Sequence, residues 1–394
     1  MKPMTILTIC MLAAGALLTA CTQQEEPESA GENTPVLRDF TINTSVAAMQ
    51  TGSGGTTSRS LQPMGPEAEN PVKSLAIIQF DSEGNLLRIN ENEGSGIERY
   101  YHYRDFTEGG TLPGNLSPQL TGISLYTGLS QTRVCFIGNM DEAAVEELLY
   151  QDGTTNPVGW NDFQNKTVTI RYITEGDEVG HVEQIYLFGY YEGALGAGGS
   201  SLDNGETAQA MSVVLSRLIA RLEISINLGE GVTLPADHHI YFRLQNVEER
   251  AYLFLNVERT NYVHQHAELM PTTDRTDYIT GAEFSTFYFY VAPHLVMSEL
   301  ADTNATRLLI WCTTESAENL KEDEADAKIL LCNDPLGEMP TAAGAFWLNR
   351  NSIYHVNITL TYEDGSSRAN GETDSPWGVK EADGSYHYRI NLKN

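Results

Sequence analysis

Short stretches in which apolar and polar residues alternate run through most of this chain of 394 residues. A period of two places successive side chains on opposite faces of an extended strand, so each stretch predicts a half-buried β-strand. In the first stretch, residues 36–48, Arg38 interrupts an otherwise regular face made by Val36, Phe40, Ile42, Thr44 and Val46. This stretch is the first strand that the sequence predicts.

Further strands are predicted at 72–80, 122–125, 133–137, 167–173, 184–190, 212–228, 239–246, 284–291, 307–313, 328–331 and 352–362, with one short helix at 141–149. Many short strands with few helices are typical of antiparallel sandwiches. A glycine-rich segment at 193–206 divides the series. The pattern therefore predicts an all-β chain of two β-sandwich domains, an N-terminal one at 60–206 and a C-terminal one at 207–394.

Residues 49–71 form a long segment rich in Gly, Ser, Thr and Pro, in which Arg59 is the one basic residue. Loops of this length inside a compact domain are uncommon, and they are usually functional or linkers. The segment following the first strand is therefore a candidate for processing.

The composition argues against several classes of function. With 24 Lys and Arg against 53 Asp and Glu, the formal net charge of -29 repels phosphate backbones, so nucleic acid is not an expected partner. The sequence has no zinc-protease, nucleophile-elbow or phosphate-loop motif. His238, His239, His264 and His266 lack distinctive carboxylates around them, and we expect exposed loop histidines. We thus predict no enzyme, no catalytic residue, no metal site and no cofactor.

The N-terminus resembles a bacterial lipoprotein signal. Lys2 precedes an apolar run that is too short to span a membrane, and the run ends in Leu18-Thr19-Ala20-Cys21. By this resemblance residues 1–20 are removed and Cys21 is acylated, with palmitate among the acyl chains, which anchors the chain in the outer membrane. The polar residues 22–35 predict a flexible tether, whose Glu25 and Glu26 resemble a surface-export signal.

Three further cysteines remain, Cys135, Cys312 and Cys332. Cys312 and Cys332 each end a strand-like run, so a disulfide between them is one alternative if the runs form a hairpin. Buried, inert thiols are the other.

Three segments together resemble the fimbrillin superfamily, the lipoprotein precursors of type V fimbriae. Leu215 to Ile224 is similar to the family's L-x-R-x-x-A-[KR] strand, and Asn349 to Thr359 to its R-N-x-x-Y strand. Ser375-Pro-Trp377 stands in place of a terminal tryptophan. The pieces at 134–139 and 188–193 lie in the expected order, so the likeness covers most of the chain.

The resemblance implies two transthyretin-like β-sandwiches in a lipoprotein that a trypsin-like, Arg-specific protease cuts after the first strand. Residues 21–59 would be the removable part, with Arg59 and Ser60 flanking the cut; Arg38 is the other candidate, but it lies inside the predicted strand. The vacated groove would then accept a strand from another fimbrial subunit by β-augmentation.

The C-terminal residues 386–394 offer a candidate donor strand. Tyr386, Tyr388, Ile390 and Leu392 alternate with polar residues, much as residues 40–48 do. A plain last strand of the second sandwich would show the same pattern, so both readings stay open.

We therefore expect a structural subunit of a cell-surface fimbria, as shaft, adaptor or tip, that supports adhesion and meets a host or bacterial surface receptor. The alternative is a monomeric, lipid-anchored surface protein of the outer membrane that binds glycan. Its 19 Tyr and 4 Trp could supply a stacking platform, although Tyr is also common in strands.

Overall fold

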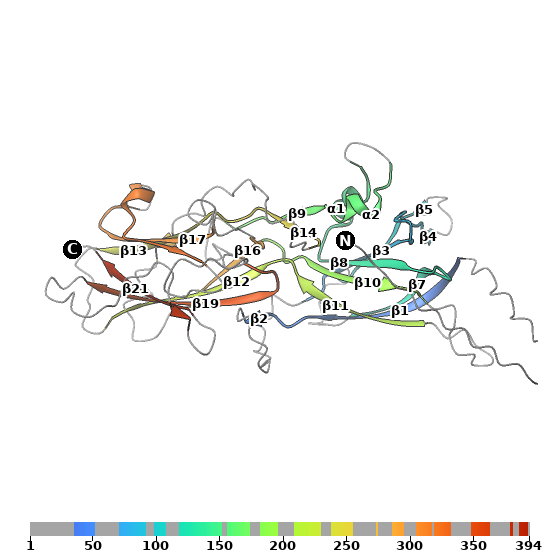
Figure 1. Cartoon of the computed structure of the whole chain (residues 1–394), viewed down its shortest axis with the longest axis horizontal. Coiled ribbons are helices and arrows are strands. Elements are labelled where there is room, and N and C mark those ends of the chain that lie inside the picture. Colours follow the sequence, from blue (N-terminus) through green and yellow to red (C-terminus); the bar gives the residue numbers. More distant parts are fainter. Residues whose placement is uncertain are drawn as a thin grey trace, which may run out of the picture. The chain divides into compact units, whose positions relative to one another are not determined.

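The computed structural model describes residues 35–51, 71–91, 98–107, 118–151, 156–173, 182–195, 209–229, 238–254, 273–274, 286–294, 305–316, 319–331, 348–362, 379–380 and 386–392. All of these lie in one compact unit, Pro35–Asn394. Two strand-rich halves with three larger sheets make up this part of the chain (Figure 1).

The first sheet has seven strands, in the order β6 (Tyr101–Asp105), β3 (Ser74–Phe80), β8 (Thr132–Gly138), β10 (Leu187–Gly193), β11 (Gln209–Arg217), β1 (Val36–Val46) and β7 (Gln119–Thr127). The sheet rolls back on itself, since His102 Nε2 of β6 lies 2.9 Å from Ser124 O of β7. Gln79 of β3, fully buried, also donates to Tyr126 O and accepts from Tyr126 N across the roll. One core cluster, with residues of β1, β3, β7, β8 and β11, fills the inside.

The outer face of β3, β8 and β10 is also buried, which is why β3 reads as a continuous apolar run. Helices α1 (Glu142–Leu149) and α2 (Trp160–Phe163) and the strand pair β9 (Thr167–Thr169) and β14 (Arg250–Tyr252) contribute to this second core. In α1, Val145, Leu148 and Leu149 are buried at the spacing of one helical face. A small hairpin, β4 (Asn90–Glu91) and β5 (Glu98–Arg99), lies beside them.

The second half is a sandwich of two sheets around a third core. One sheet has the order β16 (Thr286–Val291), β12 (Ala220–Leu228), β19 (Ser352–Tyr362), β21 (Tyr386–Leu392) and β20 (Val379–Lys380), with β2 (Gln50–Thr51) also paired to β19. The facing sheet has β15 (Thr273–Asp274), β13 (His239–Gln245), β17 (Arg307–Thr313) and β18 (Ala327–Leu330). In the described part of the acidic stretch after β17, residues 322–324 form a 3-10 turn, η5 (Glu322–Glu324).

The all-β sandwich prediction is confirmed, but the sheets are mixed and not purely antiparallel. β1 with β11, β12 with β19 and β19 with β21 are parallel pairs. Alternation reports which face of a strand is buried and carries no information on the direction of its neighbour, so the sequence could not show this.

The division of the chain at 206 and 207 stays a prediction. What the structure adds is the place where the chain changes sheets. β11 pairs with β1 and β10 in the first sheet, and β12, three residues further on, pairs with β16 and β19 in the second. Leu218 and Ile219, both fully buried, form the passage between the sheets.

The runs that precede Cys312 and Cys332 do pair as antiparallel strands, β17 and β18, but their register does not suit a disulfide. Leu330 pairs with Arg307, which lies five residues before Cys312. Five strand residues span roughly 17 Å, whereas bonded cysteines have Cα atoms less than about 7 Å apart. Cys332 itself lies outside the described residues. Cys312 is a free thiol, whose pKa burial raises to about 11, and Cys135 is a free, buried thiol.

Candidate assembly groove

The first predicted strand, β1, lies in a groove between β11 and β7, next to one end of the strand order of the first sheet. β1 runs parallel to β11, with Phe40 opposite Gln209 and Val46 opposite Leu215. On its other side it runs antiparallel to β7, from Val36 opposite Thr127 to Asn43 opposite Gln119. Figure 1 shows β1, in blue, alongside β11. Main-chain hydrogen bonds therefore hold β1 on both sides.

Three β1 side chains fill the groove. Phe40 is 3% exposed, Ile42 is fully buried and Thr44 is 4% exposed, and the two apolar ones join the core of the first sheet. Thr44 satisfies its hydroxyl by donating to Pro118 O at 2.8 Å. The predicted alternation is thus confirmed over 40–44, whereas Val36 is 47% exposed and Arg38 is exposed as well.

The outward face of β1 is polar and makes weaker contacts. Ser124 donates to the Asp39 carboxylate at 2.9 Å, and Gln119 donates to Asn43 Oδ1 at 2.8 Å, both near the surface. Exposed hydrogen bonds of this kind add little net stability. Burial of one face and the two main-chain ladders hold the strand.

Beyond β1 the chain crosses into the second sheet. Ala47 N donates to Leu215 O at 2.7 Å, and β2 then pairs with the start of β19, Gln50 opposite Ser352. Between these points Arg217 Nη1 donates to Ala47 O and Asn351 Nδ2 donates to Ala48 O, each at 2.8 Å. The N-terminal segment is therefore bound by both sheets.

The candidate donor strand lies in the second sheet, along the same edge of β19 as β2. β21 runs parallel to β19 from Tyr386 opposite Val356 to Leu392 opposite Tyr362, and the two-residue β20 pairs with its start. The strand therefore occupies the place of a last strand of the sandwich, with a short strand on its free side.

Cys21, Arg59 and Ser60 lie outside the described residues, so their roles stay predictions. Arg38 lies within β1, where it is opposite Leu125 of β7, and cleavage there would require the strand to open.

Arg217 and Asn351 lie in two of the motif segments and meet in the structure. Neither was predicted from the sequence as a site residue. Arg217 is 1% exposed, and its Nη1 and main-chain N both donate to Asn351 Oδ1. The available signal was a charged side chain at an inward position of an apolar strand. The motif glycine Gly189 also has a packing reason, because a Cβ there would come within 2.8 Å of Leu215 and Val213.

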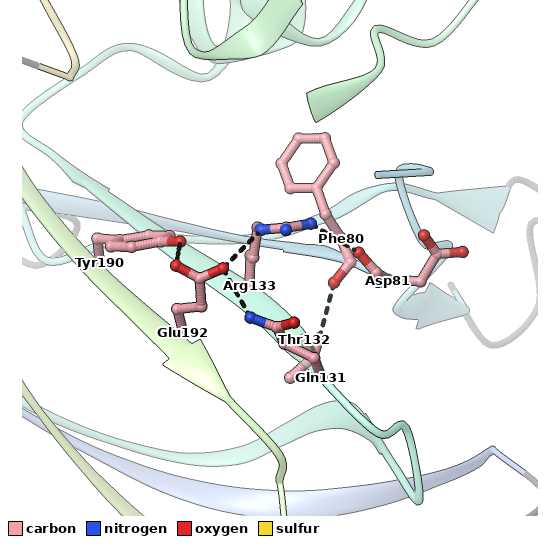
Figure 2. Close-up of polar contacts among 7 residues, drawn as sticks. All are labelled: Phe80, Asp81, Gln131, Thr132, Arg133, Tyr190 and Glu192. Atoms are coloured by element: carbon pink, nitrogen blue, oxygen red, sulfur yellow. Dashed lines mark hydrogen bonds and ion pairs between the residues drawn. The ribbon is translucent and has the colours of Figure 1, made fainter. Parts of the chain in front are cut away.

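A second candidate site lies at the ends of β8 and β10, where a tryptophan and polar side chains meet as a glycan site would require. Glu192 accepts hydrogen bonds from Tyr190, Arg133 and Gln131, at 2.6, 3.1 and 2.9 Å (Figure 2). The Tyr190 and Arg133 contacts hold the pKa of the Glu192 carboxyl below its usual range. Arg133 also donates to Asp81 O, and Thr132 to Phe80 O.

These groups cover the nearby tryptophan. Trp160 stacks on Tyr190 at 5.6 Å between ring centroids, and the Arg133 guanidinium lies 5.0 Å from its ring. Trp160 is 8% exposed and Trp311 is 1% exposed. Sugar binding by stacking requires an open aromatic face, which neither of the described tryptophans offers.

Within the described residues, no group of three or more His, Cys, Asp or Glu side chains is arranged to hold a metal. Over the same residues, no helix is long and apolar enough to cross a membrane. One buried ionisable pair lies after β13 and β16: Glu248 Oε1 is 3.2 Å from His294 Nε2, and burial raises the pKa of Glu248 to about 8.

Neither a protein-family model nor a curated protein matches the sequence. Solved structures do. A candidate cell-adhesion protein from Parabacteroides distasonis is similar with a TM-score of 0.51 at 13% identity, over 82% of this chain and 88% of that one. The tip fimbrial protein of Porphyromonas gingivalis with a C-terminal truncation is similar with a TM-score of 0.47 at 12% identity, over 81% of this chain and 94% of that one. A fimbrilin of the same organism is similar with a TM-score of 0.43 at 14% identity, over 90% of this chain and 97% of that one.

The chain therefore shares the fold of the candidate cell-adhesion protein from Parabacteroides distasonis, which is consistent with the resemblance predicted from the three motif segments.

Proposed function

We propose that this protein is a structural subunit of a cell-surface fimbria that supports adhesion and is assembled by protease-triggered donor-strand exchange. The observation that carries the proposal is the position of β1, which fills a groove between β7 and β11 with buried side chains and precedes the segment that holds Arg59. A strand so placed closes the first sheet of the precursor. Its release would open a site for another strand.

The chain order makes Arg59 a suitable cleavage point. It follows β2 and precedes β3, so a cut there separates the whole of β1 and β2 from the rest of the chain. An Arg-specific protease and other fimbrial subunits are the partners that this proposal requires. The lipidated Cys21 would hold the precursor at the outer membrane, and cleavage would release the mature subunit, whether shaft, adaptor or tip.

The donor assignment adds a second requirement. Residues 386–392 pair with β19 in the same molecule, so they must leave that edge before they can complete another subunit. Strand addition then supplies main-chain hydrogen bonds for affinity and alternate pockets for specificity.

The test is N-terminal sequencing of the protein taken from the cell surface. We expect high-molecular-weight polymers whose subunits begin at Ser60, and a receptor can then be sought on those polymers. Arg59→Ala should abolish this N-terminus and the polymers, whereas Arg38→Ala, which changes an exposed residue of β1, should leave both intact. An acylated Cys21 retained on a monomer would contradict the proposal.

A further inference from the structure

The two motif residues at the passage between the sheets form a built binding site for main chain. Arg217 ends β11, and Asn351 directly precedes β19. Asn351 has a φ of 54°, a left-handed conformation that Asn tolerates better than most residues, and its N donates to Ile219 O at 2.7 Å. Arg217 Nη1 lies 3.2 Å from Asn351 Oδ1. Each side chain is thus fixed by the other and by the backbone.

The site binds two consecutive carbonyl groups. Arg217 donates to Ala47 O and Asn351 to Ala48 O, both at 2.8 Å. The bound residues are alanines, so the contacts made here are to main chain and carry no side-chain information. The Arg217 contact is charge-assisted, and such hydrogen bonds are roughly twice as strong as neutral ones.

We propose that Arg217 and Asn351 form a carbonyl clamp that holds the main chain of whichever strand fills the groove, at the point where that strand leaves the first sheet. In the precursor the bound strand is residues 36–51. In the polymer it is the C-terminal strand, residues 386–394, of a second copy. This inference rests on the proposed function for the second occupant only, because the first is present in the structure.

The register of a strand in this groove depends on which of its side chains face the core. A slip of one residue would turn Phe40 and Ile42 away from the core, but a slip of two would keep an apolar face inward. A slip of two residues would also present two consecutive main-chain carbonyls to Arg217 and Asn351, so the clamp adds affinity without selecting the register. Packing of the inward side chains selects the register, and the clamp holds the strand beyond the regular ladder.

The inward-facing side chains give the donor a definite alignment. With Tyr386 in the place of Phe40, the residues Tyr388, Ile390 and Leu392 take the places of Ile42, Thr44 and Val46. The next two residues, 393 and 394, then present their main chain at the places of Ala47 and Ala48.

The test uses the full chain with a site for a sequence-specific protease in place of residues 53–58, so that it does not depend on Arg59. After cutting, release of the N-terminal segment is followed by native mass spectrometry with an excess of a synthetic 36–51 peptide as competitor. Asn351→Asp keeps the acceptor for Arg217 and replaces the donor to Ala48 O. We expect release to be roughly tenfold faster, as for the loss of one buried hydrogen bond.

Asn139→Asp is the matched control. Asn139 is also buried and has a φ of 62°, but its side chain donates to Pro71 O and Ile185 O. Release from this variant should occur at the unchanged rate. If Asn351→Asp does not fold, Asn351→Gly tolerates the same φ and also lacks the donor.

Peptide length provides the decisive comparison. After release, Asn351→Asp should weaken rebinding of the 36–51 peptide roughly tenfold and leave a 36–46 peptide, which lacks both clamped carbonyls, unaffected. Equal effects on both peptides, or no effect on either, would overturn the clamp. Binding of a 386–394 peptide should depend on Asn351 in the same way. If its binding does not depend on Asn351, the assignment of residues 386–394 as the second occupant is wrong.

Failure of the proposed function gives a different result. If the cell-surface protein is an uncut monomer while release still depends on Asn351, the fimbrial role fails and the clamp on residues 36–51 stands. If polymers form and the Asn351 variant matches the Asn139 variant, the fimbrial role stands and the clamp fails.

Discussion

β1 and β21, the two strands that the proposed exchange involves, are held in different ways. β1 lies between two long partners, β7 and β11, and buries Phe40 and Ile42 in the core of the first sheet. β21 has one long partner, β19, and within the described residues its other side pairs with the two residues of β20. The candidate acceptor site is therefore closed firmly, while the candidate donor is attached along one full ladder.

This difference suggests how a precursor could stay monomeric until it is processed. Leaving β19 breaks one long ladder, whereas opening the groove breaks two and exposes side chains worth about 1.5–3 kcal/mol each. The chain also continues from β2 through residues 52–70 to β3, so β1 stays tethered close to its groove until that segment is cut. The following predictions test this comparison.

The largest effect is expected from removing β1 altogether. A chain that begins at Ser60 loses the strand that joins β7 to β11, and the groove side chains of both become exposed. We expect loss of cooperative unfolding in urea and binding of a hydrophobic dye, with recovery when a 36–51 peptide is added. A chain from Ser60 that unfolds cooperatively at the midpoint of the full chain would show that β1 does not close the sheet.

A single buried side chain tests the same point on a smaller scale. Ile42→Ala should lower the free energy of unfolding by about 2–5 kcal/mol, since the site is fully buried. Asn43→Ala, on the outward face of the same strand, loses one exposed hydrogen bond to Gln119 and should cost less than about 1 kcal/mol. Urea titrations of both variants measure the difference, and equal losses would contradict the assigned face.

Much of this region could be predicted from the sequence, because burial leaves a period. The strands at 307–313 and 352–362 have the predicted bounds, and Phe40, Ile42 and Thr44 point inward as expected. Strand β6, at Tyr101–Asp105, was not predicted; its buried residues Tyr101 and His102 are adjacent and show no alternation.

Pairing and the clamp could not be predicted in the same way. Two strands far apart in the sequence show their own faces but not their mutual direction, so the parallel β1 and β11 ladder was missed. Arg217 and Asn351 are 134 residues apart and make their contacts through the fold. A buried Arg in an apolar strand signals a polar partner without naming it.

The stability of the second half should depend on pH, because the buried Glu248 lies there, after β13. Its folded pKa of about 8 is above the ordinary value of 4.5, so the folded state binds the proton more tightly. Its contribution to stability is complete below pH 4.5 and is lost as the pH rises towards 8. We expect Glu248→Gln to be less sensitive to this rise in pH by about 2 kcal/mol, because its amide does not titrate.

Urea titrations at pH 5 and pH 8 measure this dependence. Glu249→Gln removes an exposed charge that helps to raise the Glu248 pKa, so it should lose only part of the pH dependence of the unaltered chain. If Glu248→Gln and the unaltered chain lose the same stability between these pH values, the carboxyl does not titrate in that range. Release of the 36–51 segment should depend on pH much less than global unfolding does.

A small effect on stability is expected from deleting residues 386–394, although the effect on function should be complete. The deletion leaves β12, β16 and the facing sheet in place around the core of the second sandwich. We expect a cooperative urea transition with a loss of about 1–2 kcal/mol in the free energy of unfolding, in the range of ordinary single substitutions.

The same protein should still be cut after Arg59 yet fail to enter polymers, because it keeps a groove and lacks a donor. Mixed with unaltered subunits it should cap chains and shorten them, which size-exclusion chromatography can follow. Polymers of normal length from the deleted protein alone would show that another segment is the donor, and collapse of the fold would show that β21 is held as firmly as β1.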